Sequence, residues 1–329
     1  MAGVQGAELA LAVALAGGMG SLPCAMLSAA AMRAELERMR QGAPHAPFNV
    51  NFFCHTPPPP DAAREAAWRA SLLPYYQKLG VEPTVAAAAG GREPFSAPVA
   101  ALLAEFKPAV VSFHFGLPAP ELLAQVRSWG AKVLSSATTL EEGLWLQEQG
   151  VDAVIAQGLE AGGHRGMFLG TDLSTQIGTM ALLPQLTRKL HVPVLAAGGI
   201  ADARGVAAAM ALGAAGVQVG TAYLLCPQAT TSTVHRAALS SPASGHTALT
   251  NLFTGRPARG IMNRVMREQG PMGALVPAFP LAGAALAPLR AAAEAAGSGD
   301  FSPLWSGQNA SGCRAVDAGE LTQDLAGLR

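Results

Sequence analysis

The chain has 329 residues, of which 50% are hydrophobic and 13% are charged, with 22 basic and 22 acidic side chains. This composition supplies a large buried core, and the length suggests one or two domains. The formal net charge of zero argues against nucleic acid as a partner. A small ligand, either uncharged or a compact anion, fits better.

The N-terminal stretch Ala7–Ala16 is apolar, but it does not have the pattern of a targeting segment. No Lys or Arg precedes Arg33, and Glu8 interrupts the apolar run. A secretory signal carries positive charge before its apolar core, and this stretch is too short to cross a bilayer. We therefore predict an alanine-rich first helix and no membrane partner.

Four cysteines are spread along the chain without any C-x-x-C pair. They are Cys24, Cys54, Cys226 and Cys313. The spacing typical of a metal site is absent, and a disulfide framework is not expected in a chain of this length. The cysteines predict a reducing, cytoplasmic location and no bound metal.

Short apolar runs alternate with helical stretches, which indicates βα units around a parallel sheet. Several runs lack alternation, as is typical of strands covered on both faces. The predicted strands are Gly18–Pro23, Phe48–Phe53, Ala109–Phe115, Lys132–Ser135, Ala153–Gln157, Pro193–Gly198 and Gly216–Thr221. The predicted helices include Ala62–Leu79, Pro120–Trp129, Thr139–Gln149, Met180–Leu190 and Ala203–Leu212. The last of these has Asp202 as its expected N-cap and Gly213 just past its end.

Two regions lack this alternation of short strands and helices. Residues 54–108 form a long connection that opens with the Pro57–Pro60 run, which cannot continue a strand. No further strand is recognised after Thr221. The pattern predicts an α/β fold, a TIM (β/α)8-type barrel in residues 1–221 that lacks its first strand, because seven strands are counted. Residues 222–329 are predicted as a mainly helical segment over the barrel mouth.

Two glycine turns follow the last two predicted strands. They lie in PVLAAGGIADARG (193–205) and GAAGVQVGTAY (213–223). Glycine lets main-chain N–H groups approach an anion, and the helix near Ala203 adds a positive dipole end. TIM barrels often bind phosphate after strands seven and eight. We therefore predict that Ala197–Ile200 and Gln218–Thr221 bind a phosphorylated ligand, although each turn alone could be only a tight connection.

A second glycine-rich loop, IAQGLEAGGHRG (155–166), carries His164 at the carboxyl end of a predicted strand. Barrel enzymes place their chemistry at this end. Gln157 could form hydrogen bonds to the edge of a ligand ring through its side-chain amide. His164 is the candidate catalytic residue, the alternative being a surface histidine in a turn.

Other polar residues give weaker signals. Asn51 near a strand end could reach a ligand, although Asn is also common in turns. Cys54 and His55 are not expected to form a nucleophilic pair, because neighbours on a strand point to opposite faces. His114 could line the pocket or fill the barrel interior. The basic residues Arg256, Arg259, Arg264 and Arg267 are interpreted as a solvated helix face, with guidance of an anionic substrate as the minor alternative.

The combined segments resemble the nitronate monooxygenases, formerly called 2-nitropropane dioxygenases. The resemblance covers nearly the whole chain, and the NFFCHTP and QG-x-EAGGHRG pieces are its most specific parts. It is carried by FNVNFFCHTP (48–57), VVSFHFGLP (110–118), AQGLEAGGHRGMF (156–168), PVLAAGGIADA (193–203), GVQVGTAYLLC (216–226) and TNLFTGRPARG (250–260).

The resemblance implies an FMN-dependent TIM barrel that uses O₂ to oxidise alkyl nitronates, such as propionate 3-nitronate, to carbonyl compounds with release of nitrite or a related nitrogen oxide. It implies His164 as the catalytic residue, hydrogen-bonded to the nitronate or acting as a general base towards a nitroalkane, for which an unperturbed histidine pKa is well placed. It implies cofactor contacts from Asn51, Gln157, Gly162, Gly199, Gln218, Val219, Gly220 and Thr221. Members of the family carry one more strand upstream, so the resemblance also implies weaker FMN binding than in an N-terminally extended chain.

Two alternatives stay open at this point. One is an FMN-dependent NAD(P)H oxidoreductase on the same scaffold, either a quinone reductase or an enoyl-acyl-carrier-protein reductase. The other is an inactive flavin- or phosphate-binding barrel. The sequence does not decide whether the chain forms a homo-oligomer.

Overall fold

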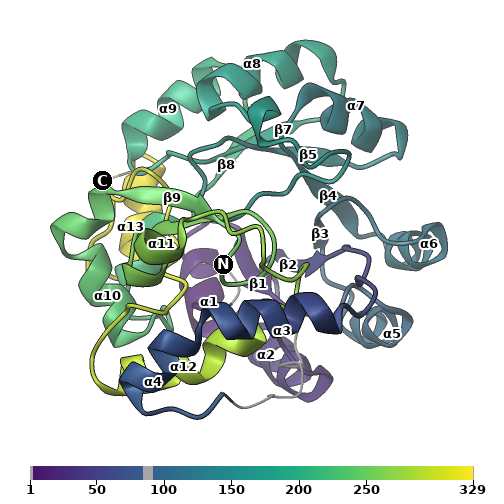
Figure 1. Cartoon of the computed structure of the whole chain (residues 1–329). Helices are drawn as coiled ribbons and strands as arrows, with labels where there is room; N and C mark the ends of the chain where they lie inside the picture. Colours follow the sequence, from purple (N-terminus) through teal and green to yellow (C-terminus); the bar gives the residue numbers. More distant parts are fainter. Residues whose placement is uncertain (1–2, 84–91, 329) are drawn as a thin grey trace.

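A curved parallel sheet forms the centre of the computed structural model, which describes residues 3–83 and 92–328. Its strands occur in the order β1-β2-β3-β4-β5-β7-β8, and every neighbouring pair is parallel. Figure 1 shows the sheet curling around the molecule's centre with helices on its outside. The strands are β1 (Gly20–Pro23), β2 (Phe48–Phe53), β3 (Val110–His114), β4 (Lys132–Ala137), β5 (Ala153–Gln157), β7 (Val194–Ala197) and β8 (Gly216–Gln218).

All seven predicted strands are confirmed, within a few residues at their ends. The last is shorter than expected, because a 3₁₀ turn begins at Thr221 (η2, Thr221–Leu225) and Gly220 precedes it. Val50, Val111, Val133 and Val154 are almost fully buried, as expected for strands covered on both faces.

The outer helices follow the strands as βα units. They are α2 (Ala29–Gly42), α5 (Ala97–Phe106), α6 (Pro120–Ser128), α7 (Leu140–Glu148), α8 (Thr179–Lys189) and α9 (Ala203–Ala211). The predicted caps of the last helix are confirmed. The Asp202 carboxylate accepts from the Gly205 N–H at 2.8 Å, and Gly213 has φ +94.

Helix α1 (Ala7–Leu15) packs against edge strand β1 and confirms the predicted first helix. An added Cβ at Gly20 would meet the Ala10 carbonyl oxygen at 2.2 Å, so glycine permits the close contact of α1 with β1. On its other side, Leu9 packs with Ala222 and Leu321 of α13 (Ala318–Leu325). The Gln5 amide donates to the Ser21 carbonyl of edge strand β1 at 2.6 Å, which satisfies an acceptor that a neighbouring strand would otherwise occupy.

In the long connection after β2, two helices occupy the range of the single predicted helix Ala62–Leu79. They are α3 (Ala62–Ser71) and α4 (Leu73–Leu79), which break at Leu72. Pro74 lies in the first turn of α4, where its missing N–H costs no helical hydrogen bond, whereas inside a continuous helix it would remove one. Both helices pack on α12 (Gly283–Ala295), as Figure 1 shows for α4.

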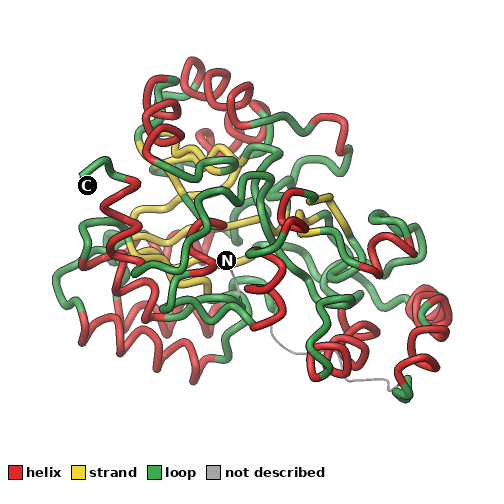
Figure 2. The backbone as a smooth tube through the Cα atoms, turned by 90° about the vertical axis from the view of Figure 1, so that its left-hand side faces the viewer, coloured by secondary structure: helices red, strands yellow, loops and turns green. Residues whose placement is uncertain are grey.

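The prediction of no strand after Thr221 was wrong. Strands β9 (Thr247–Thr250) and β10 (Ala258–Ile261) form a small antiparallel sheet with β6 (Gly163–His164). These strands are short, and β10 reads Ala-Arg-Gly-Ile without apolar alternation, so periodicity could not reveal them. The remainder is helical or irregular and includes α10 (Thr233–Leu239) and α11 (Arg264–Gln269). In Figure 2 the strands lie inside a shell of helices and loops.

Among the described residues no helix is long and apolar enough to cross a membrane. The same residues contain no group of three or more His, Cys, Asp or Glu side chains placed to hold a metal ion.

Candidate active site

A cleft lies at the carboxyl ends of the parallel strands, where the strand-end residues of β1, β2, β3, β5, β7 and β8 meet. Eight of the nine predicted site residues line it: Asn51, Gln157, Gly162, His164, Gly199, Gln218, Gly220 and Thr221. The exception is Val219, whose side chain packs against the α1–α13 cluster. No acidic side chain occurs among the described residues that line the cleft.

The two predicted glycine turns lie next to each other, because β7 pairs directly with β8. Gly198 and Gly199 have φ of +118 and +73, which L side chains rarely adopt. A Cβ on Gly198 would also lie 2.9 Å from the Thr179 hydroxyl. The turns therefore present main-chain atoms to the cleft with no side chain in the way.

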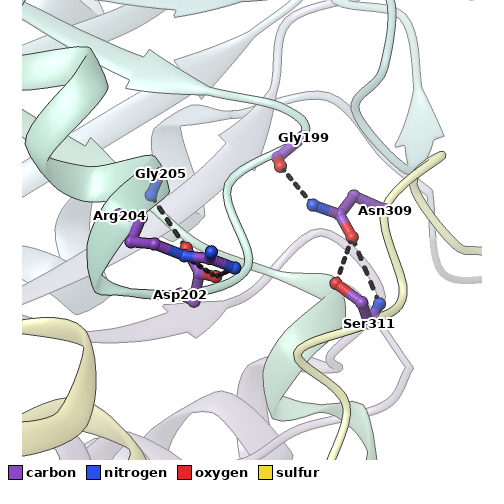
Figure 3. A network of polar contacts seen from close by, with 6 residues as sticks. All are labelled: Gly199, Asp202, Arg204, Gly205, Asn309 and Ser311. Atoms are coloured by element: carbon purple, nitrogen blue, oxygen red, sulfur yellow. Dashed lines mark hydrogen bonds and ion pairs between the residues drawn. The ribbon is translucent and has the colours of Figure 1, made fainter.

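A segment distant in sequence joins the two turns. The Gly307 N–H donates to the Thr221 hydroxyl at 2.9 Å, and the Asn309 amide donates to the Gly199 carbonyl at 2.9 Å. Figure 3 shows Asn309 reaching Gly199 from one side, with Asp202 capping α9 beside it. Sequence reasoning missed this segment, because nothing in residues 305–309 has a recognisable pattern.

The amides of Asn51 and Gln157 are already engaged with the protein. Asn51 donates to the Ser112 hydroxyl at 2.9 Å. Gln157 donates to the His164 carbonyl at 2.8 Å and accepts from the Gly166 N–H at 2.7 Å. Gln157 therefore fixes the loop that carries His164.

Arg165 holds the same loop from the protein interior and is fully buried. Its guanidinium donates to the carbonyls of Gln157 and Gly158 and to the Gln176 side chain, at 2.6 to 3.0 Å. Burial lowers the pKa of Arg165 to about 10, so the group stays charged at neutral pH. A buried arginine beside a histidine on a glycine-rich loop gives no distinctive sequence signal, and the sequence did not single it out.

His164 lies on the short strand β6, opposite Ala258 of β10. The rings of Phe53, Phe115, Phe279 and Trp305 surround it at centroid distances of 5.3 to 5.9 Å. Burial in this apolar cage lowers its pKa well below 6.5, and the positive charge of Arg92 lowers it further. The expectation that His164 titrates near its ordinary pKa is therefore wrong, and its imidazole is neutral at neutral pH.

The hydrogen bonds of Thr254 define the tautomer of His164. The Thr254 hydroxyl lies 3.0 Å from His164 Nε2 and donates to the Arg256 carbonyl at 3.3 Å. A hydroxyl has one proton, so His164 Nε2 carries the proton of the first bond. The lone pair of the neutral ring is then on Nδ1, which bonds no described residue.

His114 both lines the cleft and packs in the interior, so the two roles left open by the sequence are combined. Its Nε2 donates to the His164 carbonyl at 3.1 Å, and its Nδ1 lies 3.0 Å from the Ser136 hydroxyl. Burial lowers its pKa to about 4. His114 and Gln157 therefore converge on the same carbonyl oxygen and position His164 through the backbone.

The interpretation of the arginine cluster as one solvated helix face was wrong. Arg259 is buried on β10, and Arg256 precedes that strand. Arg256 stacks over the Phe115 ring at 4.0 Å and donates to the Met167 carbonyl. Only Arg264 and Arg267 lie on helix α11, because the chain changes from strand to helix within the cluster.

Cys54 and His55 show no features of a nucleophilic pair. Burial raises the pKa of the Cys54 thiol and lowers that of His55 to about 4. A buried thiol with a raised pKa is not reactive at neutral pH.

Comparison with known proteins shows the family. The sequence profile described as nitronate monooxygenase matches residues 1–327. The chain belongs to the nitronate monooxygenase family. It is 42% identical to a nitronate monooxygenase of Pseudomonas aeruginosa, over 99% of this chain and 93% of that protein. It is 39% identical to a nitronate monooxygenase of Paraburkholderia phytofirmans, over 99% of this chain and 89% of that protein.

Solved structures show the same fold. The nitroalkane oxidase of Streptomyces ansochromogenes has a TM-score of 0.90 and 38% identity, covering 99% of this chain and 93% of that one. A point mutant of FabK from Thermotoga maritima has a TM-score of 0.69 and 25% identity, covering 99% of this chain and 89% of that one. The nitronate monooxygenases are flavin-dependent oxidoreductases with a TIM-barrel fold, so this chain is a flavin-dependent enzyme.

In a nitronate monooxygenase with this geometry, Thr254→Val is expected to release the tautomer of His164. Valine matches threonine in shape but has no hydroxyl, and losing one hydrogen bond costs about 1 kcal/mol, roughly a fivefold change. The ¹⁵N shifts of the His164 ring should change from an Nε2–H form to a mixture of tautomers. Thr254→Ser, which keeps the hydroxyl, is the control. An unchanged Nε2–H form in Thr254→Val would contradict the assignment.

Proposed function

We propose that this enzyme uses FMN to oxidise alkyl nitronates of the propionate 3-nitronate type with O₂, yielding a carbonyl compound and nitrite or a related nitrogen oxide. The observation that carries the proposal is that His164 and two adjacent glycine turns line one cleft. Membership of the nitronate monooxygenase family over residues 1–327 supports it.

The cleft fits FMN at its glycine end. An anionic phosphate needs N–H donors, close approach and no competing carboxylate. Gly198 and Gly199 place no side chain between their main-chain atoms and the cleft, and no described lining residue is acidic. We propose that the phosphate is bound by main-chain groups of Gly199, Gln218, Val219, Gly220 and Thr221 with the Thr221 hydroxyl, and that Asn51, Gln157 and Gly162 contact the ring system.

FMN, when bound, supplies the electron acceptor for the nitronate and passes electrons to O₂. His164 is the residue that accepts or donates a proton at the substrate. Its neutral form has a lone pair on Nδ1, which can accept the α-proton of a nitroalkane. The same nitrogen, once protonated, can donate to a nitronate oxygen, and the surrounding rings of Phe53, Phe279 and Trp305 exclude water and strengthen that bond.

The two-part organisation is also a proposal. Residues 1–221 would carry the flavin, and residues 222–329 would form the substrate-side wall. Thr254 beside His164 and Trp305 against its ring support this division. The same segment also reaches the glycine end through Gly307 and Asn309.

A flavin spectrum of the purified protein tests the proposal. Anaerobic addition of propionate 3-nitronate should bleach the flavin bands, and O₂ should restore them with release of nitrite. Acid extraction should identify the flavin as FMN. Bleaching by NADH with no response to the nitronate would replace the proposal by a reductase, and a colourless protein that takes up no FMN would reject both.

A further inference from the structure

Arg92 is the only side chain with a permanent charge among the described residues that line the cleft. The guanidiniums of Arg256 and Arg259 are bound to the Met167 and Leu159 carbonyls and do not line it. Arg92 shares the lining with His164, and its positive charge lowers the pKa of that histidine. It therefore places a positive charge on the side of the cleft where His164 lies.

No described residue neutralises this charge. Arg92 has no ion pair and no hydrogen bond within the described part of the chain, and its pKa is lowered by burial and by Arg290, another cation. An arginine with a depressed pKa is still protonated at neutral pH. A partly buried guanidinium without an anion is costly, so an anionic ligand would stabilise the site.

Arg92 lies near the end of β2 and the start of α12. The Phe95 N–H donates to the Phe53 carbonyl at 2.8 Å, which ties the segment after Arg92 to the end of β2. The Arg92 guanidinium lies 3.7 Å from the position that a Cβ on Gly283 would occupy. Gly283 is the first residue of α12, whose N-terminal end adds positive potential at the same place.

We propose that Arg92 binds a second anionic group of the substrate, a carboxylate attached to the nitronate's carbon chain, and so makes the enzyme selective for nitronates that are also carboxylic acids. This inference rests on the proposed function. The planar guanidinium can hold a carboxylate with two parallel hydrogen bonds while the nitronate group lies at His164. Gly283 places no side chain beside the guanidinium.

Two nitronates of matched shape test the selectivity. Propionate 3-nitronate carries the carboxylate, and 3-methylbutane 1-nitronate carries an isopropyl group in its place. In Arg92→Met, kcat/KM for propionate 3-nitronate should fall about 10- to 100-fold, mainly through KM, since a hydrogen bond to a charged group contributes about 1.5–3 kcal/mol. The value for 3-methylbutane 1-nitronate should stay within about twofold, and Arg92→Lys should recover part of the loss.

A binding experiment gives a second readout. Succinate has the shape of propionate 3-nitronate but no reactive group, and 4-methylpentanoate matches the isopropyl compound. Succinate should bind to the flavin-loaded wild type more tightly than 4-methylpentanoate, as followed by the flavin absorbance, and Arg92→Met should remove the difference. Unchanged melting temperature and FMN content would show that the variant is folded.

The outcomes separate this proposal from the proposed function. Equal losses for both nitronates in Arg92→Met, or no loss for either, would overturn the role of Arg92 while leaving nitronate oxidation intact. Failure of the wild type to oxidise either nitronate would overturn the function itself.

Discussion

Replacement of His164 by alanine is expected to remove most turnover while FMN stays bound. His164 is the one titratable side chain of its loop that faces the cleft with an unbonded nitrogen in the described structure. General-base catalysis by a placed histidine contributes about 10²- to 10⁴-fold. The larger loss is expected for a neutral nitroalkane, whose proton must be abstracted, and a smaller one for a preformed nitronate, which needs only a hydrogen bond.

The measurement is kcat/KM for 1-nitropropane and for its nitronate, with FMN content determined on the same samples. His191→Ala is the matched control, because His191 is exposed and its main-chain N–H rather than its ring bonds Gln147. Unchanged turnover in His164→Ala would exclude His164 from the mechanism. Loss of FMN would show that the side chain acts on cofactor binding instead.

The pKa of His164 sets the pH range of this activity. A base works in its unprotonated form, and the pKa is lowered well below 6.5 by burial and by Arg92. The rate with nitroalkanes should therefore hold as the pH falls through 6.5 and decline only at more acidic pH. In Arg92→Met the nearby positive charge is absent, so the decline should move to higher pH.

The strands and the glycine turns could be predicted because their signals are local. A buried parallel strand is a continuous apolar run, and β7 and β8 are each followed by glycine at the point where the chain must turn. Since the carboxyl ends of parallel strands meet at one side of a barrel, the pattern also implied that residues as distant as Asn51 and Gly220 share a cleft. The structure places both there.

The rest depended on contacts that no local pattern encodes. Thr254 reaches His164 across 90 residues, and Asn309 reaches Gly199 across 110. The depressed pKa of His164 arises from burial among rings contributed by four separate segments. Arg92 is one arginine of many in the sequence, and it is distinguished by its place in the cleft lining without an acidic partner among the described residues.

Gly162→Ala is expected to displace the segment that joins the two glycine turns and to weaken FMN binding. The added Cβ would lie 2.5 Å from the Gly307 nitrogen and 2.6 Å from the Ser306 carbonyl carbon. Both are main-chain atoms, so no side chain can rotate away to make room. Gly307 donates to the Thr221 hydroxyl, and the adjacent Gln308 N–H donates to the Glu160 carbonyl at 2.9 Å.

Overpacking of this kind costs about 1–3 kcal/mol, which corresponds to roughly a 5- to 150-fold loss of affinity if the strain falls on the bound state. The measurement is the Kd of FMN for the deflavinated protein, by quenching of flavin fluorescence.

Gly307→Ala should weaken FMN binding in the same way as Gly162→Ala, because its Cβ would lie 2.8 Å from the Glu160 carbonyl oxygen on the other side of the same contact. Gly170→Ala is the control, since its Cβ would meet nothing within 4 Å in the connection between β5 and α8. If Gly162→Ala bound FMN as tightly as Gly170→Ala, the 305–309 segment would have no part in shaping the cofactor site, and the glycine at position 162 would serve only the packing of the loop.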